Sequence, residues 1–155
     1  MTYATCGKVP TVPGTEIQDL FRRVGWLSTP APAGEQESSP PPSPDSPPER
    51  IATPDHLQQV FEASAAIYEA RKDGALVGLA RVVSDQVRES VVYDLVVAPE
   101  HRRRGVGSIL LERCLRDFRH TPITLAASAD TLDFYRKFGF ERLERYPDLL
   151  ILRRG

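Results

Sequence analysis

Apolar side chains recur at the spacing of a buried helix face near the start of the chain. The apolar positions three and four residues apart are Ile17, Leu20, Phe21 and Val24. This spacing predicts an amphipathic helix that opens at Gly14, with Thr15 as its N-cap, and stops at Gly25. A second helix start is indicated by Thr53-Pro54, because a threonine cap followed by proline is typical of a first helical turn.

The pattern then changes to that of strands. Residues 65–71 and 75–83 are two apolar runs on either side of the Lys-Asp-Gly turn at 72–74, which predicts a β-hairpin. Residues 90–97 form an almost continuous apolar run and are expected to be a central strand of the sheet. A further short strand is expected at residues 3–7.

The last third of the chain alternates between helices and strands. The pattern predicts helices at 106–118 and 131–138 and strands at 123–127, 141–144 and 149–152. The residues expected to face inward from the longer helix are Ile109, Leu110, Cys114 and Leu115. Together the elements predict an α+β fold with a mostly antiparallel sheet and one central strand–helix–strand unit.

Residues 28–50 interrupt this pattern. Eight of the 14 prolines lie here, and apart from proline the only apolar side chains are Ala31 and Ala33. Such a stretch cannot bury enough surface to offset the entropy of ordering it. We expect a flexible insert within a single domain that spans residues 1–155, since the piece before the insert is too short for its own core.

Composition and charge argue against several classes of protein. A net charge of −1 gives no overall attraction to nucleic acid or anionic membranes, and no run approaches the roughly 18 apolar residues of a membrane span. The first six residues lack the features of a secretory signal, and Cys6 and Cys114 do not make a disulfide framework. We therefore expect an intracellular, cytoplasmic protein with no nucleic-acid or membrane partner. The histidines lack metal-ligand spacing, so no metal is expected.

The polar turn after the central strand is a candidate phosphate site. Its residues are Arg102, Arg103, Arg104, Gly105, Val106, Gly107 and Ser108. Glycines let a backbone approach an anion closely, and the first N–H groups of a helix, with its dipole, attract phosphate oxygens. The dinucleotide pattern fails because Leu110 occupies the last glycine position, and there is no P-loop. The residues alone also allow a solvated basic turn whose glycines merely start the helix.

Two motifs around this turn resemble a known family. Residues 96–111, VVAPEHRRRGVGSILL, resemble the central acetyl-CoA motif of the GNAT superfamily, and residues 133–140, DFYRKFGF, resemble its C-terminal signature. The resemblance implies a GNAT-type mixed sheet flanked by helices, whose central strand–helix–strand unit binds acetyl-CoA. It implies that the backbone of Leu95, Val96 and Val97 binds the pantetheine arm and that the turn binds the pyrophosphate.

A narrower resemblance links the chain to the small plant and cyanobacterial serotonin N-acetyltransferase-like group. It rests on residues 76–85, LVGLARVVSD, and 92–97, VYDLVV, with a weaker patch at residues 25–26. One position departs from the pattern: Ser128 stands seven residues before the motif tyrosine, where many GNAT proteins carry Asn and the plant group carries Asp. A hydroxyl there can still hydrogen-bond the cofactor, and Asp130 is close enough in sequence to substitute for the carboxylate.

Two side chains are candidates for proton transfer. Tyr135 is the expected acid, because a phenol with a pKa of about 10 is protonated at neutral pH and can donate to a departing thiolate. Its alternative role is that of a core aromatic residue. Asp94 is the only charged residue of an apolar strand, and burying an unpaired carboxylate costs several kcal/mol. It is therefore either the base or amine anchor, or the structural ion-pair partner of an arginine such as Arg81.

The expected reaction is direct transfer of an acetyl group from acetyl-CoA to the primary amine of a small molecule, in a ternary complex. An arylalkylamine is one candidate acceptor. A protein or peptide N-acetyltransferase is an alternative within enzymes, and a non-catalytic acyl-CoA-binding or interaction module is an alternative outside them. The resemblance also leaves room for a homodimer.

Overall fold

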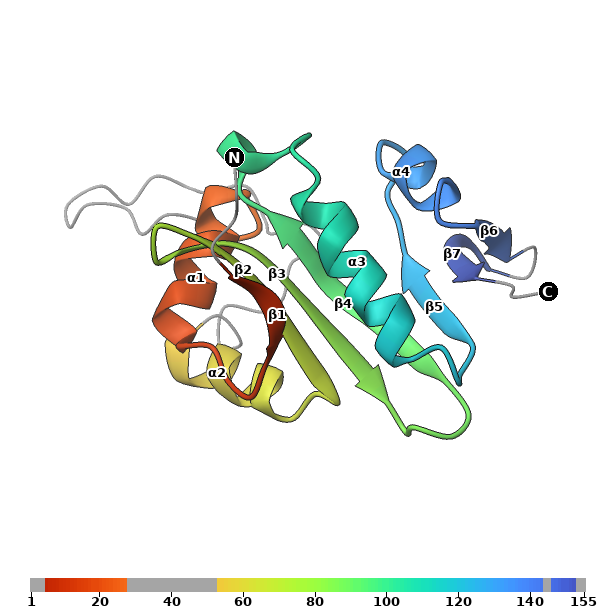
Figure 1. Cartoon of the computed structure of the whole chain (residues 1–155), viewed down its shortest axis with the longest axis horizontal. Coiled ribbons are helices and arrows are strands. Elements are labelled where there is room, and N and C mark those ends of the chain that lie inside the picture. The colour runs from red at the N-terminus through yellow and green to blue at the C-terminus, as the bar shows by residue number, and fades with distance from the viewer. Residues whose placement is uncertain (1–4, 28–52, 144–145, 153–155) are drawn as a thin grey trace, which may run out of the picture.

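The structure, a computed structural model, describes residues 5–27, 53–143 and 146–152 (Figure 1). The strands are β1 (Thr5–Val9), β2 (Ala66–Lys72), β3 (Ala75–Ser84), β4 (Ser90–Val97), β5 (Ile123–Ala126), β6 (Phe140–Leu143) and β7 (Tyr146–Leu152). The helices are α1 (Gly14–Arg23), α2 (Pro54–Glu62), α3 (Val106–Asp117) and α4 (Leu132–Arg136), with a short 3-10 turn, η2 (Pro99–His101). The insert expected at 28–50 lies outside the described residues.

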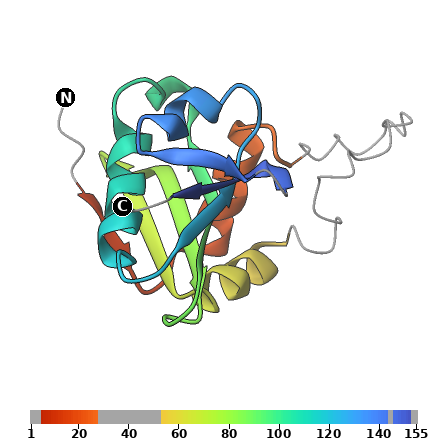
Figure 2. The same ribbon diagram turned by 90° about the vertical axis from the view of Figure 1, so that its right-hand side faces the viewer.

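All seven strands belong to one sheet, in the order β1-β2-β3-β4-β5-β7-β6. Neighbouring strands are antiparallel except β4 and β5, which run parallel and are connected through α3. Helices α1 and α2 cover one face of the sheet and α3 covers the other (Figures 1 and 2). This arrangement confirms the expected α+β class and its central strand–helix–strand unit.

Local sequence signals determine the central strands. The β2–β3 turn contains Asp73 at φ 51° and Gly74 at φ 81°, and two left-handed residues are what a tight two-residue hairpin turn requires. The hairpin is therefore confirmed. Strand β4 has the predicted limits, because its apolar run lies in the middle of the sheet.

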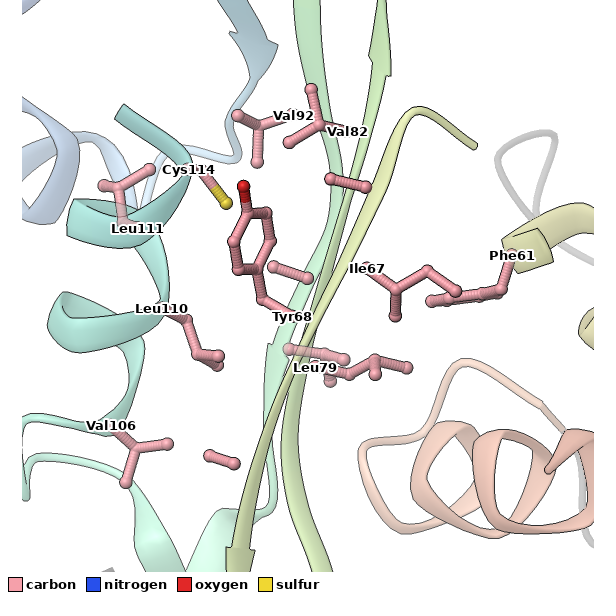
Figure 3. Close-up of a cluster of buried hydrophobic side chains, with 14 of the residues drawn as sticks. Phe61, Ile67, Tyr68, Leu79, Val82, Val92, Val106, Leu110, Leu111 and Cys114 are labelled. Carbon is pink, nitrogen blue, oxygen red and sulfur yellow. The ribbon is translucent and has the colours of Figure 1, made fainter. Parts of the chain in front are cut away.

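Two apolar layers pack on the two faces of the sheet (Figure 3). On one face Tyr68 of β2 points toward α3, where Leu110 and Cys114 are fully buried. On the other face Leu79 of β3 lies on the same side as Phe61 of α2. Fully burying a large apolar side chain contributes about 1.5–3 kcal/mol. These layers fix the helices, and so the start of α3, relative to β4.

Gly78 of β3 determines how closely α3 approaches the sheet. A Cβ atom at this position would lie 2.9 Å from Val106 Cγ1 and 3.0 Å from Leu110 Cδ1. Gly78 is also the register partner of Val97 at the end of β4. The missing side chain therefore lets the first turn of α3 pack directly beside the end of the central strand.

Two details of the helices differ from the prediction. Helix α1 begins at Gly14 with Pro13 at the N-cap and no side-chain cap, so Thr15 lies inside the first turn and is not the cap. Ile109, expected to face inward, is 38% exposed, because the side of α3 that packs on the sheet is the one carrying the neighbouring Leu110.

The C-terminal elements also differ in length. Helix α4 ends at Arg136, since the N–H groups of Phe138 and Gly139 bond to carbonyl groups only three residues back, at 3.0 and 2.9 Å. Gly139 has a φ of 85°, as expected for a residue that follows a helix end. Strand β7 begins at Tyr146, earlier than predicted, because pairing with Leu143 of β6 extends it.

Candidate active site

Strands β4 and β5 pair over only a short segment. The parallel register joins residues 90–92 of β4 to residues 123–125 of β5. Within the described residues, 93–97 have no register partner on β5, although β4 stays paired with β3 as far as Val97. We call residues 93–97 the open half of β4. Among the described residues, no strand pairs with the backbone groups that this half of β4 turns toward the β5 side.

A β-bulge begins the open half of β4. The register with β3 shifts between Leu79 and Arg81, so that β4 carries an extra residue at this point. Asp94 lies in the bulge at φ 53°, a left-handed conformation that costs a non-glycine residue about 1–3 kcal/mol. Its carboxylate pairs with Nε of Arg81, the ion pair that the sequence analysis gave as the structural alternative, and the role of Asp94 as base or amine anchor stays a prediction.

The backbone groups at the end of β4 point alternately toward β3 and toward the open side. The N–H of Ala98 donates to the carbonyl of Val77 at 2.8 Å and so faces β3. By alternation, Val97 and Leu95 turn their N–H and C=O groups to the open side, whereas Val96 turns its groups to β3. Val96 is 4% exposed, so its side chain contributes to the core.

Helix α3 starts without a side-chain cap. Its N-cap residue, Gly105, has a φ of 83°, and Arg103 is also left-handed at 58°. The N–H groups of residues 106–108 have no acceptor within the helix, and the helix dipole favours an anion at this end. Arg102, Arg103 and Arg104 are exposed around this turn. The geometry therefore fits a phosphate-bearing ligand.

Two contacts connect this turn to the open half of β4. Nε of Arg102 donates a hydrogen bond to the carbonyl of Val97 at 3.1 Å. A Cβ atom at Gly107 would lie 3.6 Å from Val97 Cγ2 and 3.6 Å from Phe134 Cζ. The start of α3, the end of β4 and α4 thus meet around Gly107. Phe134 was not among the predicted site residues, and its position in the second motif was its only signal.

Tyr135 of α4 is buried, with 7% of its surface exposed. Its ring packs against Phe134 and Phe140, with 5.1 and 5.9 Å between ring centroids. Burial raises the pKa of Tyr135 to about 12, and the nearby Cys114 thiol acts in the same direction. The phenol is therefore protonated at neutral pH, as an acid must be, but it is a weaker acid than free tyrosine.

The two candidate proton-transfer residues contact different parts of the structure. Arg81, the partner of Asp94, lies over the ring of Phe61 at 5.7 Å, on the face that α2 covers. Tyr135 packs instead against Phe134 of α4 and Phe140 of β6. The structure therefore does not gather Asp94 and Tyr135 into one cluster.

Ser128 lies between β5 and α4 and is exposed. Its hydroxyl is 3.1 Å from the hydroxyl of Thr131, and its carbonyl accepts a hydrogen bond from that same hydroxyl at 3.0 Å. These contacts hold the loop that leads into α4. Asp130, on the same loop, is exposed.

The described part of the chain offers neither a cluster of metal ligands nor a membrane-spanning helix. It contains no group of three or more His, Cys, Asp or Glu side chains placed to hold a metal ion. None of its helices is long and apolar enough to span a membrane.

The chain matches the family model of the acetyltransferase (GNAT) domain over residues 30–146, which is more than half of its 155 residues. The protein therefore belongs to the GNAT family. A GNAT family acetyltransferase from Streptococcus pneumoniae TIGR4 has a similar structure, with a TM-score of 0.68, 28% identity, and coverage of 91% of this chain and 89% of that one. The family resemblance of the sequence is confirmed.

Plant proteins are among the relatives. Serotonin N-acetyltransferase 2, chloroplastic, of Oryza sativa subsp. japonica is 31% identical over 93 residues, which cover 56% of this chain and 46% of that protein. Histone acetyltransferase TAP1 of Glycine max is 33% identical over 76 residues, which cover 47% of this chain and 33% of that protein. The chain thus spans less than half the length of these curated relatives.

Proposed function

We propose that the protein transfers an acetyl group from acetyl-CoA to the primary amine of a small molecule, directly and in a ternary complex. The observation that carries this proposal is the open half of β4 beside the uncapped start of α3. A strand edge suits an extended, amide-containing arm, and a helix N-terminus suits the anionic end of the same ligand. Family membership supports the same activity.

The binding roles follow from the backbone. Residues 105–108 would bind the pyrophosphate with their N–H groups, and the arginines at 102–104 would add positive charge. Leu95 and Val97 would bind the pantetheine arm from the open side of β4. Because the carbonyl of Val97 already accepts a hydrogen bond from Arg102, its N–H is the group suited to polarise the thioester carbonyl. We assign Ser128 a cofactor contact through its hydroxyl.

Two side chains would interact with the reacting groups during proton transfer. Bound acetyl-CoA supplies an activated acetyl group, and Asp94 would hold the ammonium group of the acceptor and take its proton, directly or through water. Tyr135 would act at the departing thiolate. A phenol with a pKa of about 12 is poorly matched to a thiol near 8.5. We therefore assign Tyr135 a hydrogen bond to the thiolate, in preference to complete proton transfer.

The acceptor class has two candidates. A small arylalkylamine is favoured by similarity to the rice protein, which is named a serotonin N-acetyltransferase. A protein or peptide amine is favoured by similarity to the soybean protein, which is named a histone acetyltransferase. For the compartment we propose the cytoplasm, with the chloroplast as the alternative that the name of the rice relative suggests.

An acceptor panel tests the proposal. The purified protein is given acetyl-CoA with 2-phenylethylamine, serotonin, putrescine or a lysine-containing peptide, and release of free CoA is followed. We expect turnover with at least one small amine at a kcat/KM at least about 10 times that for the peptide, a difference of about 1.4 kcal/mol in transition-state binding. The reverse preference would establish the peptide alternative. Acetyl-CoA binding without CoA release on the whole panel would indicate a non-catalytic binding module.

A further inference from the structure

We propose that Arg81 is a positioning residue for the acceptor: it holds Tyr93 and Asp94 as one surface on which the amine substrate binds. In this surface Tyr93 contacts the apolar part of the acceptor, and Asp94 receives its ammonium group. The inference rests on the proposed function. It adds Arg81 and Tyr93, which lie outside the two motifs at residues 96–111 and 133–140.

The guanidinium of Arg81 contacts four side chains. Its Nε pairs with the carboxylate of Asp94, and its Nη1 donates to the hydroxyl of Ser64 at 3.3 Å. Its central carbon lies 4.9 Å from the ring centroid of Tyr93 and 5.7 Å from that of Phe61. The group thus links the end of α2 to the open half of β4.

Arginine is suited to this position in a way that lysine is not. A planar guanidinium can donate from two edges while aromatic rings cover its faces, whereas an ammonium is a single point charge. The side chain of Arg81 is only 16% exposed, so the contacts form in a largely dry environment where they are stronger. Holding two parts of a site in one geometry is therefore a role for this residue in particular.

The open half of β4 requires such support. Asp94 has a left-handed backbone, and residues 93–97 lack the pairing with β5 that holds the first part of the strand. The ion pair with Arg81 is the cross-strand contact that fixes the direction of the carboxylate. Without it, Asp94 could turn away while the strand remained in the sheet.

Tyr93 and Asp94 are accessible in the way that a substrate surface requires. Tyr93 is 46% exposed although it belongs to a central strand, and its ring already has a cation near it. In the described part of the chain, Arg81 engages Oδ2 of Asp94, and Oδ1 remains for an ammonium group. An exposed ring beside a carboxylate, at the open half of the strand, fits an amine with an apolar body.

Three substitutions test the inference, with whichever panel amine (2-phenylethylamine, serotonin or putrescine) wild type acetylates fastest as the probe. Arg81→Met keeps the stem and removes the guanidinium, Arg81→Lys keeps only the charge, and Tyr93→Leu removes the ring. The matched control is Arg71→Met on β2, since Arg71 is 18% exposed and also ion-paired, with Glu69 and Glu16, outside the proposed site. Steady-state kinetics, calorimetric acetyl-CoA affinity and thermal melts are measured for each variant.

We expect Arg81→Met to lower kcat/KM for the amine by about 100-fold, because a small misplacement of reacting groups has effects of this size. Acetyl-CoA affinity should stay within about twofold of wild type. Arg81→Lys should have a melting temperature close to that of wild type but a kcat/KM as low as that of Arg81→Met. Tyr93→Leu should raise KM for the amine by about 5- to 10-fold with kcat retained. Arg71→Met should lower the melting temperature and leave kcat/KM unchanged.

Several results would overturn the inference. An active wild type with equally active Arg81 variants would refute it and leave the proposed function standing. A wild-type kcat/KM in Arg81→Lys would show that the positive charge alone matters. A loss of acetyl-CoA affinity in Arg81→Met as large as its loss of kcat/KM would show a general collapse of the bulge. If Arg81→Met does not fold, Arg81→Lys and Tyr93→Leu decide between the same outcomes. A wild type that acetylates none of the amines would overturn both proposals.

Discussion

Helices α2 and α3 begin in opposite ways. The start of α2 is satisfied by its own chain: the side chain of Thr53 accepts the N–H of His56 at 3.3 Å, and Pro54 has no N–H to satisfy. The start of α3 has Gly105 as its N-cap, which has no side chain that could accept. The sequence at the start of α2 thus stabilises the helix, whereas the start of α3 leaves its first N–H groups for a ligand.

The two halves of β4 show the same contrast. In the first half Ser90 is fully buried, its N–H donates to the carbonyl of Pro122 at 2.9 Å, and its hydroxyl lies 2.5 Å from that of Thr121. In the second half the strand bulges at Asp94 and loses its pairing with β5. The uncapped start of α3 and the half of β4 that lacks a partner on β5 lie side by side, and together they form the candidate site.

The largest expected effect comes from filling the uncapped start of α3. Gly107→Trp should weaken acetyl-CoA binding by at least about 100-fold, or about 2.7 kcal/mol, because an indole would project between Val97 and Phe134. Isothermal titration calorimetry measures the affinity, and a thermal melt checks the fold. Gly7→Trp on β1 is the matched control, since a Cβ there meets nothing within 4 Å. Unchanged affinity in a folded Gly107→Trp protein would remove the pyrophosphate assignment.

Tyr135→Phe tests the α3 side of the site without altering the start of the helix. It should lower kcat by about 10- to 1000-fold and leave acetyl-CoA affinity within about twofold. Because burial raises the pKa of Tyr135 to about 12, the phenol stays protonated well above neutral pH. The wild-type rate should therefore show no loss from this group below about pH 11. Full activity of the phenylalanine variant would exclude the hydroxyl from the mechanism.

Asp94→Asn tests the open half of β4. Asparagine tolerates the left-handed conformation, so the bulge should persist. The value of kcat/KM should fall by about 10- to 100-fold while the amine substrate is protonated, and the loss should shrink near the pKa of the amine, about 10. A pH–rate profile of both proteins measures this. A constant ratio from about pH 6 to about pH 10, together with a lower melting temperature, would indicate a purely structural aspartate.

The smallest effect is expected at the satisfied helix start. Thr53→Ala removes the acceptor for the N–H of His56 and should cost about 1 kcal/mol of unfolding free energy, or about 2–4 °C in Tm. Acetyl-CoA affinity should not change. Thr53→Ser, which keeps the cap, is the control. If Thr53→Ala weakened acetyl-CoA binding as much as it lowered stability, the two helix starts would not be functionally different.

Local sequence signals determined what could be predicted. The hairpin turn at Asp73-Gly74, the apolar run of β4 and the Gly105 turn are each specified by neighbouring residues, and the structure has all three. The open half of β4 also had a signal in the predicted strand lengths, since a strand over 90–97 cannot pair along its whole length with the shorter strand expected at 123–127.

Contacts between distant segments could not be predicted in the same way. The left-handed backbone of Asp94 depends on its register with β3, and the sequence shows there only one polar residue in an apolar run. The role of Gly78 depends on the approach of Val106, which belongs to α3 and is distant from Gly78 in the sequence. The burial of Tyr135 likewise depends on how α4 packs on Phe140 of β6. The ion pair of Asp94 with Arg81 was predictable because burying a carboxylate requires a partner.

The short pairing between β4 and β5 has a consequence for motion. Residues 90–92 and 123–125 form a three-residue ladder, shorter than any other ladder among the described strands, and it is the line along which β1–β4 join β5, β7 and β6. Segments open locally where few backbone bonds hold them, so transient separation along this line can widen the candidate site while each part keeps its own ladders. A ligand that bridges α3, β4 and α4 would restrain that separation. Hydrogen exchange at residues 123–125 should therefore slow when acetyl-CoA binds.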